Sequence, residues 1–333
     1  MTNGIYTLAN DVVYNQLVAL LNSIEVNSPN LSVCVIAYDN RLDLVRQEIA
    51  NRKNVMLMDN PELFARWDEF SLRVWETHPT ALKMWHEKGI KPFYRVSENH
   101  RYVAFDPDSP FEKFIYLDAD TLVLNSLDFI IDQLDKKDFV IYDFQYKDPS
   151  HIFNVNSPKL LEVFSQEMIN TKIFCSGFYG AKRGIFPPDR RNWLISKLAE
   201  GDAEILYPLA PNQSVLNYMV MKSNIDIYNF ALHLPDEQKT GCSVTSTHFK
   251  ARDNVLYDKD ARLTYLHYIG VSSKLFNKLC DGENLECGYR DIFLHYRYLH
   301  EPEKQPKFTG KPKLYNPPPS LAKRVLRKLG LKK

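Results

Sequence analysis

The sequence has few cysteines and no closely spaced pair of them. Only five occur in 333 residues, and the nearest two are Cys280 and Cys287. Their spacing is unlike that of a zinc knuckle, so we expect no zinc site. An odd number of scattered cysteines, mostly in apolar settings, is typical of a protein from a reducing compartment.

Long apolar runs are also missing. No stretch approaches the ~18 uninterrupted apolar residues that a membrane span needs. The first four residues lead straight into a strand-like run, so we expect no signal peptide and a cytoplasmic protein. The hydrophobic content of 44% and the charged content of 25% are those of a globular protein, and the length allows one large domain or two modest ones.

Charge is distributed unevenly along the chain. The net charge is +1, but residues 301–333 hold ten basic and two acidic residues, whereas the remainder is acidic. An acidic body argues against a nucleic-acid partner. It favours a metal-dependent enzyme whose basic tail is attracted to an anionic membrane.

The C-terminal region has two parts. Residues 301–319 are rich in proline and lysine, which predicts a stiff linker after a domain formed by residues 1–300. In residues 320–333, apolar and basic side chains fall on opposite arcs of a helical wheel. This pattern predicts a basic amphipathic helix that binds an anionic membrane surface peripherally. A solvated, frayed terminus is the alternative.

The first third of the chain alternates strand and helix patterns. Residues 4–9, 31–37 and 55–58 are short and apolar, as buried strands are, and helical spacing separates them. A strand–helix–strand alternation of this kind predicts an α/β fold with a mostly parallel central sheet flanked by helices.

Residues 114–124 are the most informative stretch. An apolar strand ends on Asp118 and Asp120, and apolar residues resume directly afterwards. Aspartate is unfavourable in strands, and a buried unpaired carboxylate is costly, so a divalent cation is the natural partner. Two carboxylates suit Mg²⁺ or Mn²⁺, which commonly keep positions for substrate phosphates. A helix N-cap is the alternative for either aspartate.

Other motifs follow the same order as those of a known family. They are residues 5–11 with Tyr14 beyond them, residues 94–96, residues 116–124, residues 174–177, residues 212–217, and residues 267–270 with Lys274 beyond them. In these segments the chain resembles the retaining glycosyltransferases of family 8, which include glycogenin and bacterial lipopolysaccharide galactosyltransferases. The resemblance implies a GT-A type nucleotide-diphospho-sugar transferase fold with a C-terminal extension.

The resemblance also implies an activity. The protein would transfer a sugar from a UDP-sugar to an unknown sugar, lipid or protein acceptor, with retention. Asp118, Asp120 and His267 would be the ligands of Mn²⁺ or Mg²⁺; two carboxylates and an imidazole disfavour Ca²⁺. Gln213, Asn212 and Asp120 would be the catalytic residues, with Gln213 beneath the anomeric carbon.

A larger set of residues is expected to contact the donor and its metal. Tyr14 would stack on uracil, and Arg95 and Lys274 would support the phosphates. Alternatives are a core histidine at 267, a surface ion pair at Arg95 and a half-buried helix residue at Tyr14. The complete expected set is Thr7, Leu8, Ala9, Asn10, Tyr14, Arg95, Asp118, Ala119, Asp120, Ser176, Gly177, His267, Gly270 and Lys274.

The sequence departs from the family pattern at three polar positions. Asn212 and Ser214 stand where the family has aspartates, and Cys175 stands where it has asparagine. With no carboxylate nucleophile at 212 or 214, a front-face route through an oxocarbenium-like state is favoured. A catalytically inactive nucleotide-sugar-binding protein is the second hypothesis. A haloacid-dehalogenase-type phosphatase is the third, and Leu122 disfavours it.

Overall fold

The computed structural model describes residues 2–315. The predicted amphipathic segment 320–333 and the end of the predicted linker lie outside these residues. Among the described helices, none combines the length and the apolar character that crossing a bilayer requires.

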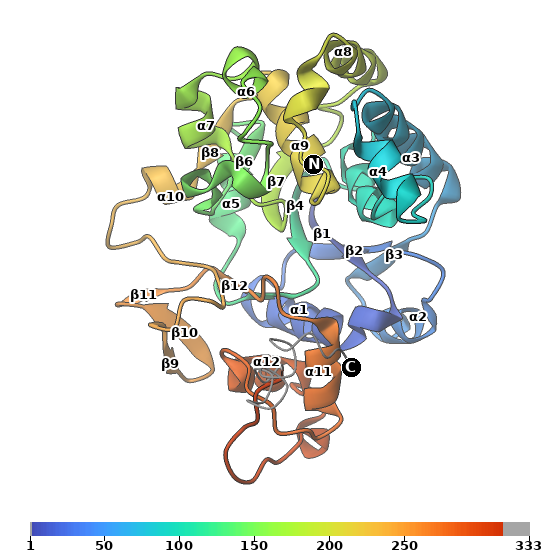
Figure 1. Cartoon of the computed structure of the whole chain (residues 1–333). Helices are drawn as coiled ribbons and strands as arrows, with labels where there is room; N and C mark the ends of the chain where they lie inside the picture. Colours follow the sequence, from blue (N-terminus) through green and yellow to red (C-terminus); the bar gives the residue numbers. More distant parts are fainter. Residues whose placement is uncertain (1, 316–333) are drawn as a thin grey trace, which may run out of the picture.

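A seven-stranded sheet forms the centre of the molecule (Figure 1). The four strands at one edge are mutually parallel, and the fifth is antiparallel to both of its neighbours. This arrangement confirms the predicted α/β fold with a mostly parallel sheet. In spatial order the strands are β3 (Val55–Met58), β2 (Ser32–Ala37), β1 (Asn3–Ala9), β4 (Lys113–Asp118), β7 (Phe178–Lys182), β6 (Phe139–Ile141) and β8 (Ile227–Asn229).

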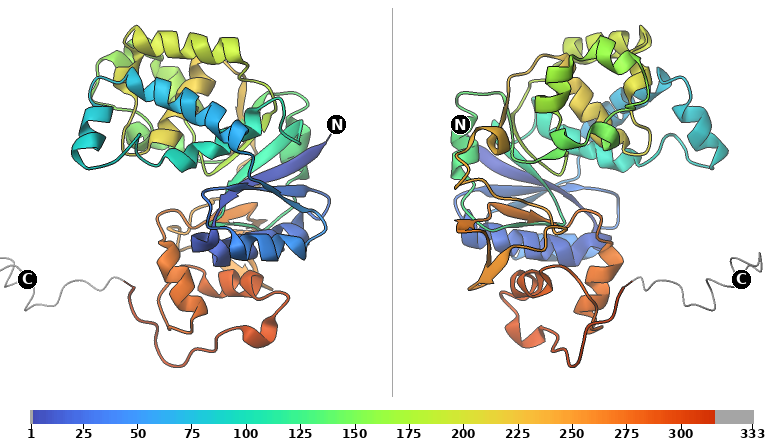
Figure 2. Two further views of the ribbon diagram at one scale, coloured as in Figure 1. Left: turned by 90° about the vertical axis from the view of Figure 1, so that its right-hand side faces the viewer. Right: turned by 60° about the vertical axis from the view of Figure 1, so that its left-hand side comes forward.

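Helices cover both faces of the sheet (Figure 2). Side chains alternate along β1, so Tyr6 and Leu8 join the core beneath α3, whereas Ile5 and Ala9 join the core above α1. The helices are α1 (Tyr14–Asn27), α2 (Asp43–Ala50), α3 (Pro61–Glu76), α4 (Ala81–Glu87), α5 (Asp128–Gln133), α6 (Lys159–Val163), α7 (Gln166–Lys172), α8 (Pro188–Ala199), α9 (Pro211–Lys222), α10 (Phe230–His233), α11 (Ser273–Cys280) and α12 (Arg290–Arg297).

Two small sheets are separate from the central one. β5 (Thr121–Val123) pairs antiparallel with β12 (Tyr265–His267), in a register that places His267 opposite Thr121. β9 (Lys250–Arg252), β10 (Val255–Asp258) and β11 (Ala261–Arg262) form a separate antiparallel sheet. The β5–β12 pair connects the chain after β4 with a segment about 150 residues later.

Two segments near the end of β4 have irregular backbone. The segment Val96–Phe105 is a 3-10 helix that follows Arg95 in a left-handed conformation, with φ of 56°. β7 begins only at Phe178. Residues 174–176 donate their backbone N–H groups to side chains instead of to a neighbouring strand.

Part of the predicted linker lies against the body of the protein. Lys313 forms an isolated β-bridge with Leu285, and the guanidinium of Arg290 lies 4.7 Å from the ring centre of Phe308. Tyr315 packs on the small apolar cluster that includes Leu275. The chain is therefore held to α11 and α12 as far as residue 315.

Candidate metal and nucleotide site

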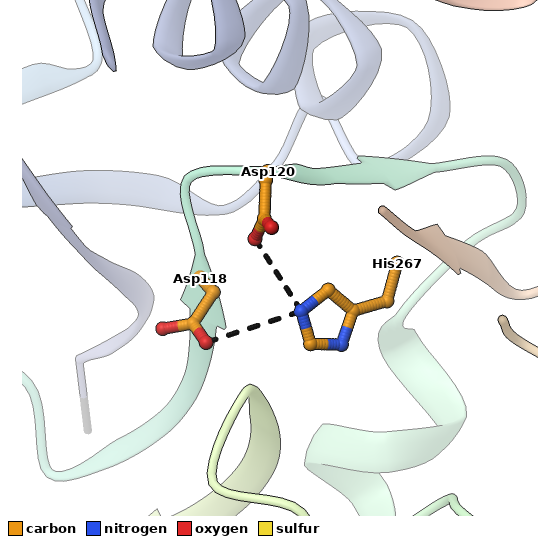
Figure 3. A group of neighbouring side chains, drawn as sticks. All are labelled: Asp118, Asp120 and His267. Carbon is orange, nitrogen blue, oxygen red and sulfur yellow. Dashed lines mark ion pairs between the residues drawn. The ribbon is translucent and has the colours of Figure 1, made fainter. Parts of the chain in front are cut away.

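Asp118, Asp120 and His267 come together at the carboxyl end of β4 (Figure 3). Nε2 of His267 lies 3.3 Å from Oδ1 of Asp120 and 4.0 Å from Oδ2 of Asp118. One ligand atom from each residue lies within 4.8 Å of the others. The structure therefore assembles the three predicted metal ligands from β4, the turn before β5, and β12.

Backbone pairing holds His267 in place. Its N–H donates to the carbonyl of Cys242 at 2.7 Å, and the N–H of Tyr268 donates to the carbonyl of Asp120 at 2.9 Å. Burial disfavours the imidazolium, but the interactions with Asp120 and Cys175 together outweigh burial and raise the pKa of His267 well above its ordinary value. A divalent cation would displace that proton, because a ligating imidazole is neutral.

Gly177 makes room for this group of residues. A Cβ at position 177 would lie 2.4 Å from Cε1 of His267 and 2.9 Å from Oδ2 of Asp118. The carbonyl of Gly177 accepts the N–H of Asp118 at 2.9 Å. The backbone thus approaches both ligands more closely than any side chain would permit.

Arg101 is a residue of this site that sequence reasoning missed. Its Nη2 lies 3.3 Å from Oδ1 of Asp118, and its Nη1 donates to the carbonyl of Ser176 at 3.1 Å. The side chain is 5% exposed and lies over the ring of Tyr116. An arginine directly before the apolar residues 102–105 was the available signal, because a buried arginine requires a partner. Arg95, which was selected instead, pairs with Glu98 at 3.2 Å and is 47% exposed.

A pocket of about 620 Å³ opens over the three candidate ligands. Tyr38, Arg41, Glu98 and Arg101 also line it, and sequence reasoning named none of the four. The remaining predicted residues that line the pocket are Leu8, Ala9, Asn10, Arg95, Ala119, Ser176, Asn212, Gln213 and Gly270.

Tyr14 lies elsewhere, which corrects the expectation that it stacks on a base. Its hydroxyl donates to Oε2 of Glu48 at 2.9 Å, and it lines a second pocket of about 610 Å³ beside α1 and α2. The helix that begins at Tyr14 turns this side chain away from the metal ligands. Tyr38 is the aromatic residue that lines the candidate nucleotide pocket.

Thr7 and Lys274 also lie outside the lining of the pocket. Thr7 is fully buried within β1. Lys274 is exposed in the first turn of α11, where its backbone N–H contacts the Ser272 hydroxyl. Neither position supports the predicted contact with a nucleotide.

The N-terminal turn of α9 is tied to the site by amide side chains. Oε1 of Gln213 accepts the N–H of Ser176 at 3.0 Å, and its Nε2 donates to the carbonyl of His151 at 3.3 Å. Asn212 donates its amide to the Glu98 carboxylate. Ser214 is fully buried, and its hydroxyl accepts the N–H of Tyr207, so it faces away from the pocket.

Asp143 is a second residue that sequence reasoning passed over. It is 3% exposed and accepts the N–H groups of Gln145 at 2.7 Å and Cys175 at 3.1 Å. Burial raises its pKa to about 7. It lines a neighbouring pocket of about 450 Å³, which shares Cys175 and His267 with the nucleotide pocket.

Solved structures of glycosyltransferases share this architecture. No protein-family model and no curated protein matches the sequence. A crystal structure of the galactosyltransferase LgtC, in complex with donor and acceptor sugar analogs, aligns with a TM-score of 0.51 at 16% identity, over 83% of this chain and 94% of that chain. An apo structure of the bifunctional glycosyltransferase WbbM aligns with a TM-score of 0.52 at 14% identity, over 91% of this chain and 52% of that chain. The chain has a GT-A glycosyltransferase fold. At these identities the likeness establishes the fold alone.

We predict that Gly177→Ala weakens Mn²⁺ binding roughly ten- to a hundredfold, because the added methyl group pushes His267 or Asp118 out of position. Isothermal titration calorimetry measures this affinity. The matched control is Gly180→Ala in β7, three residues further on, where the new Cβ would lie 2.6 Å from a methyl group of Val140. That variant is expected to lose stability and keep its affinity for the metal. Equal metal affinity in the wild type and Gly177→Ala would contradict the prediction.

A second prediction concerns the pH dependence of stability without metal. The folded-state pKa of Asp143 is raised to about 7, so this carboxyl holds its proton in the folded state after releasing it in the unfolded state. Its contribution to the free energy of unfolding therefore falls as the pH rises from about 4 to about 7.

Asp143→Asn removes this titration. Relative to the wild type, the variant should gain about 2 kcal/mol between about pH 5 and about pH 7. Urea unfolding in the presence of a chelator measures the difference. Parallel pH profiles for the two proteins would exclude a raised pKa at Asp143.

Proposed function

We propose that this protein is a metal-dependent retaining glycosyltransferase that transfers a sugar from a UDP-sugar to an acceptor. The observation that carries the proposal is the group formed by Asp118, Asp120 and His267 in the lining of a pocket in a glycosyltransferase fold. Ligands of open α/β sheets bind beyond the carboxyl ends of the strands, and this is where the group lies.

The donor set fits a hard or borderline divalent cation. Two carboxylates and one imidazole suit Mn²⁺ and accommodate Mg²⁺. Bound there, the ion would neutralise the charge that develops on the leaving diphosphate. Arg101 holds Asp118 in its orientation, and Gly177 leaves space for the His267 ring.

Two groups of residues in the pocket offer different contacts. Leu8 and Ala9 at the end of β1, and Asn10 directly after it, line the pocket together with Tyr38, which supports a nucleoside beside them. The N–H of Ser176 donates to Gln213, and both residues line the pocket with Asn212, which supports the sugar beside them. The sugar would then lie beside the candidate metal ligands.

Retention fits the side chains at the start of α9. Asn212 and Gln213 carry amides, and Ser214 is buried, so this turn presents no carboxylate nucleophile. We infer a front-face route in which the leaving phosphate accepts the proton of the acceptor hydroxyl. Gln213 also holds Ser176 and the backbone around it, so its proposed role includes positioning.

A nucleotide-sugar-binding protein without turnover is the second candidate. It is favoured by the amides of Asn212 and Gln213, which are both engaged with protein groups. UDP binding without hydrolysis or transfer would support this candidate. A GT-A fold argues against the haloacid-dehalogenase alternative.

The acceptor is proposed only as a sugar, a lipid or a protein. We further propose a cytoplasmic protein that residues 320–333 bring to anionic membranes, as the sequence pattern of that segment predicts.

Metal-dependent nucleotide binding tests the main proposal. We expect wild-type protein to bind UDP with Mn²⁺, and Asp120→Asn to bind it at least roughly tenfold more weakly, because one anionic ligand is lost. Calorimetry with UDP and a hydrolysis assay with a panel of UDP-sugars provide the measurements. Asp132→Asn, which neutralises an exposed aspartate on α5, is the matched control and should behave as the wild type. Absence of both UDP binding and hydrolysis in the wild type would refute the proposal.

Liposome flotation tests the membrane proposal. The full chain should float with anionic vesicles, and a chain that ends at Asn316 should not, because each basic residue near such a surface contributes about 1 kcal/mol. Vesicles of neutral phosphatidylcholine serve as the control. Equal flotation of the two proteins with anionic vesicles, or flotation of neither, would contradict it.

A further inference from the structure

A partly buried carboxylate that the metal site does not use lines the nucleotide pocket. Glu98, in the 3-10 helix Val96–Phe105, has a side chain that is 18% exposed. One of its oxygens accepts the amide of Asn212, and the other lies 3.2 Å from Nη1 of Arg95. A carboxylate has about four acceptor positions, and these two partners occupy only two of them.

Glu98 belongs to a closed series of contacts beside the metal ligands. Nε of Arg101 donates to the carbonyl of Glu98 at 3.0 Å, and its Nη2 lies 3.3 Å from Asp118. Nη1 of the same arginine donates to the carbonyl of Ser176 at 3.1 Å. The series continues from Ser176 to Gln213 and from the adjacent Asn212 back to Glu98.

In the contact between Glu98 and Asn212, the 3-10 helix supplies the acid and α9 supplies the amide. The family resemblance leads one to expect a carboxylate at position 212, where this chain has an amide. The Glu98 carboxylate accepts a hydrogen bond from that amide, so an acid from the 3-10 helix lies next to the amide of α9. The pair still presents one anionic acceptor and one amide to the pocket.

The neighbouring group identifies the ligand chemistry. A diphosphate held by Asp118, Asp120 and His267 would carry its sugar beside them, and Glu98 and Asn212 line the same pocket as these three residues. Sugar hydroxyls donate hydrogen bonds, and a charged acceptor binds such donors more strongly than a neutral one. A buried acceptor also discriminates strongly against a ligand that lacks the matching hydroxyl.

We propose that Glu98 accepts a hydrogen bond from a hydroxyl of the donor sugar and thereby selects sugars that carry a free hydroxyl at that position. This proposal rests on the proposed function. It gives Glu98 a role in choosing the sugar, separate from binding of the nucleotide and the metal.

The first test compares ligands with and without the sugar. Calorimetry in the presence of Mn²⁺ measures the affinity of wild type and Glu98→Gln for UDP and for the UDP-sugar that the wild type binds best among UDP-glucose, UDP-galactose and their deoxy analogues. We expect UDP affinity to change by less than about twofold and UDP-sugar affinity to fall roughly tenfold, because an anionic acceptor is replaced by a neutral one. Glu76→Gln, at the exposed end of α3, removes the same charge outside the pocket and is the matched control.

A swap of the two groups provides the second test. Asn212→Asp alone sets a carboxylate against Glu98 and should weaken UDP-sugar binding. The double variant Glu98→Gln with Asn212→Asp again has one acid and one amide in contact, and it should recover most of the UDP-sugar affinity that either single variant loses. Recovery of this kind excludes a general folding defect as the cause.

Each outcome separates this proposal from the function on which it rests. Absence of UDP binding by the wild type refutes the proposed function. Normal UDP binding with unchanged UDP-sugar affinity in Glu98→Gln refutes the contact with the sugar. Equal losses for UDP and UDP-sugar, without recovery in the double variant, show that Glu98 only supports the structure, and they overturn the proposal.

Discussion

The antiparallel pairing of β5 with β12 is the interaction on which the site depends. It joins the segment after Asp120 to a strand about 150 residues later and sets the register that places His267 opposite Thr121. The hydrogen bond from Tyr268 N–H to the carbonyl of Asp120 extends this pairing to the ligand itself. A shift by one residue would turn His267 to the other face of the strand and separate it from both aspartates.

Close packing around this pairing leaves little tolerance for change. Gly177 lies against the His267 ring, and its carbonyl accepts the N–H of Asp118. The three residues before it donate their N–H groups to side chains: Phe174 to Asn217, Cys175 to Asp143, and Ser176 to Gln213. Because these partners are side chains, the segment that faces the metal ligands is positioned by α9 and by Asp143, just after β6. Residues of α9 therefore influence the site even where they do not contact a substrate.

The charges around the site explain why the sequence predicted Asp118 and Asp120 as site residues but did not predict Arg101. Asp118 and Asp120 were identified because carboxylates interrupt an apolar strand, and their position needs a positive partner. Arg101 supplies part of that positive charge, because it pairs with Asp118. Arg101 lies in a 3-10 helix, whose sequence lacks the regular spacing of apolar residues that would show which face is buried. Arg95, six residues earlier, looked equivalent in sequence but is half exposed and pairs with Glu98. Tyr14 was misplaced for a related reason, because the exact start of α1 decides to which side its ring points.

The sequence by itself determined the class of fold and the carboxylate pair. Short apolar strands separated by amphipathic helices can bury their side chains only in a layered α/β sheet, and a strand that ends in two aspartates needs a cation. Only the tertiary structure decided which distant groups meet that pair. The approach of His267, the ion pair of Arg101 and the contact of Glu98 with Asn212 all depend on long-range packing. Such contacts are set by strand register and by side-chain burial on opposing elements, and local residue patterns do not encode either of these directly.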